Sequence, residues 1–509
     1  MGVERVAVLS DPRVGLATAP KPWEYPAQRP FPPEEEYPEL AGRVRPGAER
    51  NIVYPLFRQL ARSLGLDAAR YGTPEWNPLG GLVEPGQKVL LKPNLVRDEH
   101  TRGGDYQAVV THASVVRCVL DYVALAMKGQ GVITVGDAPV QNTDFARLLE
   151  RTALAEVCDD VSRTWQIPVR LVDFRVCFAR FDADHRMVDR GKLEGSPEGS
   201  RLIDLGSSSL LAPLSGDCAK FRVTNYDPQA MKRHHDQRTH QYVIAQTVLD
   251  ADVVINLPKL KTHRKVALTA ALKNLVGINA HKDCLPHHRC GSVVEGGDEY
   301  RGRSLLKRMI ARCEDAINRA PFARSNGLRG LAIRMARRLG RYLWAEPYQE
   351  GSWYGNDTLW RTVLDLNRIL FYANRQGIMT DEIQRHCFTV VDGVIGGEGE
   401  GPMEPDARPC GLLAGGANPA AIDAVLATLI GFDYVRIPLI AKAFRLDPRP
   451  LVCFSPEDVR VCCEDPRHAG LRVGKPRAAF RFKPPSGWVG HVECSPPEVQ
   501  SVPFPCNNS

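Results

Sequence analysis

Short apolar runs rich in β-branched residues alternate along this chain with segments whose apolar residues have helical spacing. We expect the short apolar runs to be strands and the segments between them to be helices. The predicted strands are Val6–Leu9, Lys88–Leu91, Val132–Val135 and Val169–Val172. This alternation is typical of an α/β fold with a doubly wound, mostly parallel sheet.

The same pattern returns in the second half of the chain. Ala251–Pro258, Val390–Val391 and Leu412–Ala414 are further predicted strands. Several strands in both halves are followed directly by polar residues, such as Asn94 and Asp137. In open α/β sheets ligands bind outside the carboxyl ends of the strands, so we expect a site at this edge.

A stretch between these halves interrupts the alternation and predicts the domain organisation. It carries two basic helical patterns, Leu305–Ile317 and Leu328–Leu343, which we interpret as a largely helical insertion. The predicted division is a discontinuous α/β core of residues 1–280 and 378–455, a helical basic insertion at 281–377, and a C-terminal extension at 456–509.

Composition excludes some classes of protein. The chain has 509 residues, of which 43% are hydrophobic and 25% charged, so it can bury a large core and is not disordered as a whole. No window reaches the roughly 18 apolar residues that a membrane span needs, and the start has no export signal. We therefore expect a cytoplasmic protein that is not integral to a membrane.

The 14 cysteines are scattered and form no CxxC pair. We expect most of them to be reduced, buried small hydrophobes. An iron–sulfur cluster of the ferredoxin type is not expected, because no closely spaced four-cysteine run exists.

Positive charge is concentrated in the predicted insertion. Between Arg301 and Arg341 there are twelve Lys or Arg but only two acidic residues, whereas the whole chain carries +7. The rest of the chain is therefore mildly acidic. A basic character confined to one segment does not favour a nucleic-acid partner.

The densest group of candidate binding residues lies in the run Asn256–Asn279. We expect a loop after Pro258 and a helix that ends near Asn279. Lysine and amide donors at a strand end can neutralise carboxylate or phosphate oxygens, although a solvated basic loop would look similar. With the residues after the second strand, the predicted substrate-binding set here is Lys92, Asn94, Lys259, Lys261, Lys273 and Asn274.

Histidine is also unevenly distributed, because seven of the thirteen lie between positions 234 and 288. Imidazole can bind a metal, donate to an anion or transfer a proton near neutral pH, or it can simply pair with neighbouring polar residues. We assign His263 as a candidate catalytic residue and His112, His287 and His288 as candidate substrate-binding residues.

Carboxylates at strand ends complete the candidate site. Asp137 and Asp392 are candidate catalytic residues, and Asp392 precedes a glycine-rich stretch, Gly393–Pro402, that we expect to be a loop. Such carboxylates can act as general acid or base or hold a divalent ion such as Mg²⁺. The candidate metal ligands are Asp283, His281 and Glu398. A structural zinc site using Cys284 and Cys290 is a weaker alternative.

Taken in combination, several motifs resemble the domain of unknown function 362 family. They are KPNLV (92–96), THASVV (111–116), GDAP (136–139), NLPKLKTH with KNLVGIN (256–279), and DGVIGGEGEGP followed by NPAAIDAVLATLIGFD (392–433). The resemblance covers about Lys88–Asp433 and implies an α/β fold but no particular reaction. It adds Thr111 and Asp423 as motif residues, with a cap or packing role open for Asp423. Many relatives resemble fusions to a ferredoxin-type module, whose cysteines this chain lacks.

Three classes of function remain open from the sequence. The leading one is an enzyme acting on a small carboxylated or phosphorylated metabolite, with assistance from a divalent metal as an option. The second is a protein associated with a transition metal or with redox partners. The third is a peripheral scaffold at an anionic membrane. The oligomeric state is not indicated.

The membrane hypothesis depends on the second basic helix, with Trp344 and Trp353 nearby. Its apolar stripe can lie in a lipid headgroup region with arginines on phosphates, or it can pack on the α/β core. The stripe is Leu328, Leu331, Ala332, Met335, Leu339 and Leu343.

Overall fold

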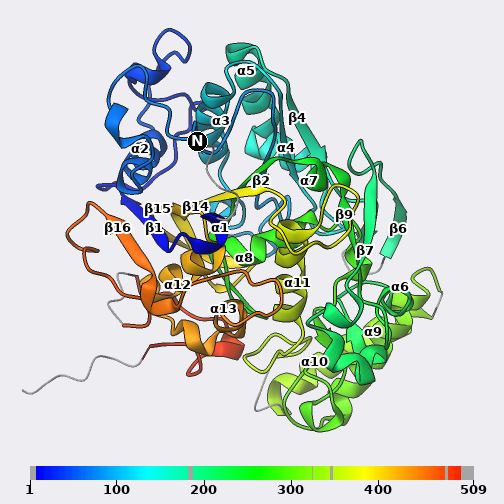
Figure 1. Ribbon diagram of the computed structural model, residues 1–509. Helices are drawn as coiled ribbons and strands as arrows, with labels where there is room; N and C mark the ends of the chain where they lie inside the picture. The colour runs from blue at the N-terminus through cyan, green and yellow to red at the C-terminus, as the bar shows by residue number, and fades with distance from the viewer. Residues whose placement is uncertain (1–6, 182–186, 324, 344–347, 476–479, 495–509) are drawn as a thin grey trace, which may run out of the picture.

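The computed structural model describes residues 7–181, 187–323, 325–343, 348–475 and 480–494. Its largest sheet runs across the centre of the molecule (Figure 1) in the order β16-β1-β15-β14-β10-β2-β3-β4. The strands are β16 (Arg460–Cys463), β1 (Arg13–Thr18), β15 (Glu404–Gly416), β14 (His386–Glu400), β10 (Val253–Leu257), β2 (Lys88–Pro93), β3 (Val132–Asp137) and β4 (Val169–Asp173).

Most of this sheet is parallel. The neighbours β14, β10, β2, β3 and β4 all pair in parallel, whereas β15 is antiparallel to both β14 and β1. All five residues of β10 are buried, as expected for a parallel strand that is covered on both faces.

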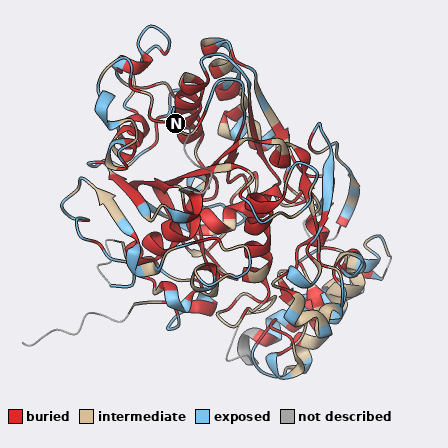
Figure 2. Ribbon diagram, viewed as in Figure 1, coloured by how far each residue is buried: buried red, intermediate tan, exposed pale blue. Residues whose placement is uncertain are grey.

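Helices cover both faces of the sheet, so the doubly wound α/β architecture is confirmed. One layer contains α2 (Val53–Ser63), α3 (Ala113–Met127) and α5 (Leu154–Trp165), seen above the sheet in Figure 1. The opposite layer contains α8 (Ala271–Asn274), α11 (Leu359–Tyr372) and α12 (Pro419–Leu429). Each layer has its own buried apolar cluster. Figure 2 shows that the strands of the central sheet and the helices beside them are mostly buried.

The predicted first strand is wrong. Val6 lies outside the described residues, and Ala7–Ser10 forms the short helix α1. The strand begins at Arg13 instead, where Gly15 allows β1 to lie against Leu60 of α2 and Leu64 just beyond its end. This choice depends on pairing with β15, nearly 400 residues away in the chain, which no local pattern indicates.

Two segments expected to be loops are strands. The glycine-rich stretch after Asp392 continues β14 as far as Glu400 and pairs with β15. Lys259–His263 forms β11, which pairs with β14 and with β12 (Ala267–Thr269). Gly397 permits this close packing, because a Cβ there would lie 3.0 Å from the Cβ of its β11 partner Lys261.

The two predicted basic helices are present as α9 (Leu305–Arg319) and α10 (Asn326–Leu343). They pack against each other at the lower end of the molecule in Figure 1, around Ile310, Ile333 and Ala336. In contrast, α11 packs into the main core. The division into core, insertion and extension stays a prediction.

The described cysteines are all free, but only five of these thirteen are buried, so the prediction that most are buried is wrong. None of the helices in the described part of the chain is long and apolar enough to span a membrane.

Candidate functional site

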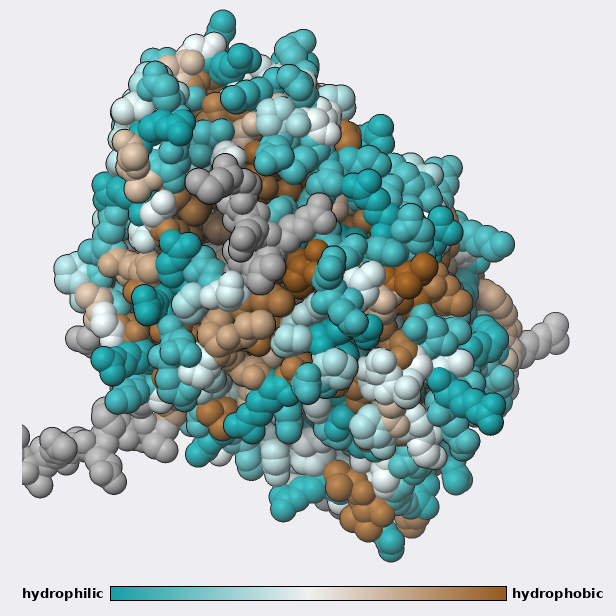
Figure 3. All heavy atoms as spheres, viewed as in Figure 1, coloured by the Kyte–Doolittle hydropathy of each residue, from teal (hydrophilic) through white to brown (hydrophobic). Residues whose placement is uncertain are grey.

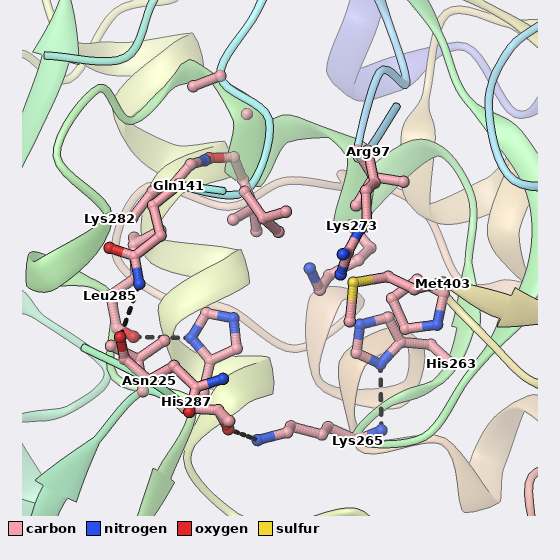
Figure 4. A pocket seen from close by; sticks show the side chains of 18 of the residues that line it. Arg97, Gln141, Asn225, His263, Lys265, Lys273, Lys282, Leu285, His287 and Met403 are labelled. Atoms are coloured by element: carbon pink, nitrogen blue, oxygen red, sulfur yellow. Dashed lines mark hydrogen bonds between the residues drawn. The ribbon is translucent and has the colours of Figure 1, made fainter. Parts of the chain in front are cut away.

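A pocket of about 370 Å³ opens at the carboxyl ends of β2 and β3 (Figure 4). The long segment that follows β10 supplies much of its wall. Seven of the residues predicted from the sequence line this pocket: Lys92, Asn94, Asp137, His263, Lys273, Asn274 and His287.

A buried ion pair forms the floor of the pocket. Lys92 Nζ lies 2.7 Å from Asp137 Oδ1, and both side chains are almost fully buried. The backbone N–H groups of Leu95 and Ala138 also donate to the Asp137 carboxylate, each at 2.8 Å. Because burial disfavours the charged amine, the pKa of Lys92 is lowered despite this partner.

Asn274 connects this floor to the neighbouring strands. Its Oδ1 accepts hydrogen bonds from Lys92 Nζ at 3.2 Å and from Asn94 Nδ2 at 3.1 Å. Its Nδ2 donates to the carbonyl of Lys92 and to Asn256 Oδ1. The amide is thereby held in one orientation.

Two histidines on the wall offer opposite hydrogen-bonding capacities. The Lys265 N–H donates to His263 Nδ1 at 3.1 Å, so a neutral His263 ring carries its proton on Nε2. His287 Nδ1 donates to the carbonyl of Leu285 at 2.7 Å, which leaves Nε2 as an acceptor. Burial and nearby lysines hold the pKa of both rings well below 6.5, so both are neutral at pH 7.

The pocket also contains lysines that are not matched by carboxylates. Among the described residues, none forms a hydrogen bond or ion pair with Lys273 Nζ, which projects into the pocket (Figure 4). Burial and repulsion from Lys92 and Lys265 lower the pKa of Lys273 to about 8. Burial lowers the pKa of Lys282 to about 7, and within the described part of the chain its Nζ has one hydrogen-bond partner, the Val276 carbonyl at 3.5 Å.

The carboxylates that line the pocket are already engaged. Asp137 is paired with Lys92, and Glu350 accepts a hydrogen bond from Thr224 Oγ1 and approaches Arg337 at 3.5 Å. The pocket therefore has excess positive charge that a bound anion would compensate.

Lys261 lies behind the pocket rather than in its lining. Its Nζ donates to Asn94 Oδ1 at 2.9 Å and to the Val109 carbonyl. Thr111 Oγ1 bridges the same region by accepting from the Asn94 N–H and donating to the Leu257 carbonyl. These contacts orient Asn94.

Three other candidates lie together in a second buried cluster. Lys259 Nζ is 3.0 Å from Asp392 Oδ2, and both side chains are fully buried. Tyr25 from the N-terminal segment donates to Asp392 Oδ1 and stacks on His112 with the ring centroids 3.9 Å apart. Burial lowers the pKa of His112 to about 3. The cluster joins the N-terminal segment to β11 and β14 and does not line the pocket.

The remaining candidates are dispersed. His288 belongs to β13 (His288–Arg289), which pairs with β8 (Phe221–Arg222), and Glu398 accepts from the Lys483 N–H. Asp423 on α12 accepts from the Ala271 and Leu272 N–H groups at 2.7 and 3.1 Å, so it caps the helix that carries Lys273. His281 and Asp283 lie beside Cys177.

Several lining residues were not predicted. Lys265 and Lys282 stand within the lysine- and histidine-rich runs, so their proximity to His263 and His281 was an available signal. Phe181, Tyr226 and Met403 come from segments without a motif, and only the fold brings them to the pocket.

The fold and site define an α/β protein with a cation-rich pocket at the carboxyl edge of its sheet. The family model described as "Domain of unknown function (DUF362)" matches residues 89–177 and 202–428, more than half of the chain. The chain belongs to this family, as the motifs predicted.

One curated relative is a thylakoid-associated protein of Synechocystis sp., which is 23% identical over 379 residues, 73% of each chain. A crystal structure of a Thermotoga maritima protein aligns with a TM-score of 0.29 and 11% identity. That alignment covers 70% of this chain and 54% of the solved chain, so the present chain spans about half of the length of that protein.

Replacing Gly277 by Ala tests the packing of the floor. A Cβ at this position would lie 1.8 Å from Asp137 Oδ1 and 2.5 Å from Lys92 Nζ, so the buried pair must separate. We expect Gly277→Ala to lower the free energy of unfolding by about 3–5 kcal/mol, measured by chemical denaturation. Gly302→Ala is the control, because nothing lies within 4 Å of its Cβ position. Equal stabilities of the two variants would contradict this account.

Lys273 gives a stability prediction with a defined pH dependence. Its pKa falls from 10.5 to about 8 on folding, so the charged amine destabilises the folded state below pH 8. We expect Lys273→Met to raise the free energy of unfolding at pH 7 by on the order of 2 kcal/mol. The gain should shrink between pH 8 and 10.5, where the wild-type amine becomes neutral in both states. Denaturation of Lys273→Met and of the exposed control Lys442→Met at pH 7 and 10 checks this, and a pH-independent gain would contradict it.

Proposed function

We propose that this protein is an enzyme that binds a small carboxylated or phosphorylated metabolite in the pocket beside Lys273. The observation that carries this proposal is the partly buried Lys273 amine, which has no acceptor among the described residues. Removing an amine from water without a compensating partner is costly, and a bound oxyanion supplies that partner.

The walls favour an anion that also has an apolar part. Phe181, Val223, Leu285 and Met403 line the pocket beside the lysines. Small-molecule sites commonly combine such apolar walls with a few polar groups that orient the ligand. A phosphate or carboxylate would bind between Lys273 and Lys282, with the rest of the molecule against these side chains.

The two neutral histidines provide the proposed base and a hydrogen-bond donor. His287 offers an unprotonated nitrogen that can accept a proton, while the N–H of His263 can donate a hydrogen bond to negative charge that develops on the ligand. Asp137 can transfer a proton only if its ion pair with Lys92 breaks. We therefore assign the Lys92–Asp137 pair a structural role at the base of the pocket.

Ligand binding to Lys273→Met tests the proposal. Inorganic phosphate and a panel of phosphorylated and carboxylated metabolites are screened by thermal shift, and dissociation constants are measured by calorimetry. We expect Lys273→Met to weaken binding of the best ligand about 10- to 100-fold, because a charge-assisted hydrogen bond is lost. Affinity for the wild type should also fall as pH rises through the pKa values of about 7 and 8.

Lys442→Met is the matched control, since it removes an exposed lysine on α13 (Pro438–Ala443). We expect it to bind the same ligand as the wild type does. Unchanged affinity in Lys273→Met would remove the basis for the anion site.

A second candidate function, peripheral contact with an anionic membrane, is favoured by the surface of α10. Four of the leucine and methionine side chains of its apolar stripe are exposed and are not packed on the core. Leu328 is 75% exposed and Met335 62%, with Leu331 and Leu339 also exposed. Leu343 and Trp344 have side chains outside the described residues, and Trp353 is buried.

The arginines of α10 also suit contact with an anionic membrane. Arg329, Arg334 and Arg338 flank the stripe, and apolar atoms are visible at the lower tip of the molecule in Figure 3, where α9 and α10 lie. An apolar stripe flanked by arginines matches an anionic headgroup layer. The relative named for its thylakoid association is consistent with membrane contact by this protein as well.

Vesicle co-sedimentation tests this second function. We expect the wild type to bind vesicles containing phosphatidylserine but not pure phosphatidylcholine, and to dissociate as salt is raised. The double variant Leu331→Asn with Met335→Asn should lower partitioning about tenfold or more, because two apolar side chains no longer insert. Ile378→Asn, an equally exposed position outside this helix, is the control. Binding by the double variant at the wild-type level would refute the assignment.

A further inference from the structure

Next to the pocket, three side chains of different chemistry converge on one point. Cys177, His281 and Asp283 each place a potential ligand atom within 4.8 Å of the other two. Within the part of the chain that is described, this is the group whose donors suit a metal ion. Of these three residues, His281 and Asp283 were candidate metal ligands from the sequence, whereas Cys177 lies about a hundred residues away from them in the chain and was not.

We propose that Cys177, His281 and Asp283 bind a zinc-type divalent ion that fastens the paired strands β5 (Cys177–Phe181) and β6 (Met187–Lys192) to the wall of the pocket. Thiolate, imidazole and carboxylate are the three ligand types that zinc takes in proteins, and three protein ligands leave one position for water. The assignment does not depend on which anion the pocket binds.

The geometry is close to that of an occupied site. His281 Nδ1 lies 4.0 Å from Asp283 Oδ2, whereas ligand atoms about 2.0–2.3 Å from a tetrahedral metal are roughly 3.5 Å apart. The three donor atoms, which lie within 4.8 Å of one another, would need to come closer together to bind one ion. His281 Nδ1 is buried and has no hydrogen-bond partner among the described residues, which is costly unless something binds it.

An arginine pairs with the carboxylate that would bind the ion. Asp283 is fully buried, and its carboxylate is paired with Arg190 of β6 (Met187–Lys192) while also accepting from the Asp227 N–H. Arg190 is about one-third exposed and can move into solvent, whereas Asp283 cannot leave. The ion and Arg190 therefore compete for the same carboxylate.

The position of the site means that a bound ion would affect residues that line the pocket. Cys177 begins β5 (Cys177–Phe181), and Phe181 at the other end of that strand lines the pocket. His281 and Asp283 stand on either side of Lys282, a pocket lysine. Binding would thus hold the paired strands against the segment that carries Lys282 and set the position of both pocket residues.

Cobalt binding to the untagged full-length chain tests the proposal. We expect one equivalent of Co²⁺ to bind with a thiolate-to-cobalt charge-transfer absorption, which reports the Cys177 ligand directly. Cys177→Ser should lose this absorption, and His281→Ala should weaken binding. Cys462→Ser in β16 is the control, since it also removes a partly buried cysteine and should keep the wild-type spectrum.

Arg190→Ala separates a metal site from an ordinary buried ion pair. Removing the competing cation should tighten Co²⁺ and Zn²⁺ binding about tenfold or more, and Zn²⁺ should restore the melting temperature that the variant loses. The proposal is overturned if the wild type shows no thiolate absorption, if Cys177→Ser retains it, or if Arg190→Ala binds no more tightly than the wild type.

Discussion

Burial of lysine at one edge of the parallel sheet is the constraint around which this molecule is organised. A lysine taken out of water must find a carboxylate, find polar neighbours or lose its charge. Lys92 and Lys259 have carboxylates, Lys261 has only neutral acceptors, and Lys273 has none among the described residues. The difference in available partners therefore separates the structural lysines Lys92, Lys259 and Lys261 from Lys273, which we assign to ligand binding.

The paired lysines hold the framework on which the pocket depends. The cluster around Asp392 attaches the N-terminal segment through Tyr25 to β11 and β14. The Lys92–Asp137 pair joins the ends of β2 and β3, and Asp423 caps α8 from the far side. Together these interactions fix the position of α8, and Lys273 on this helix projects into the pocket rather than toward solvent.

The surface beyond the pocket has two features that could connect ligand binding to its surroundings. The metal site proposed at Cys177 would adjust one wall through Lys282, and the exposed stripe of α10 would bring the molecule to a membrane. The two are independent, because they use different elements and different chemistry. The α9–α10 pair has its own small apolar cluster, so contact there need not disturb the main core.

Local patterns predicted much of this protein, and the reason is physical. Apolar periodicity is set by burial on one or both faces of an element, so the parallel strands, most helices and the α/β class followed from the sequence, as did the family. Lys92 and Asp137, chosen because they follow predicted strands, and Lys273, chosen on the helix after a strand, line the same pocket. Asp392 and His112 were also predicted as site residues, but they lie in the buried cluster that joins the N-terminal segment to β11 and β14.

Tertiary structure alone decided the rest, because pairing between distant segments carries no local signal. It made strands of the glycine-rich stretch and of Lys259–His263, and it placed Cys177 beside His281. It also determined which lysines have partners, since a partner is a matter of distance in space and not of spacing along the chain. The sequence by itself determined the kinds of charge at the edge of the sheet, and the fold decided which of those charges remained uncompensated.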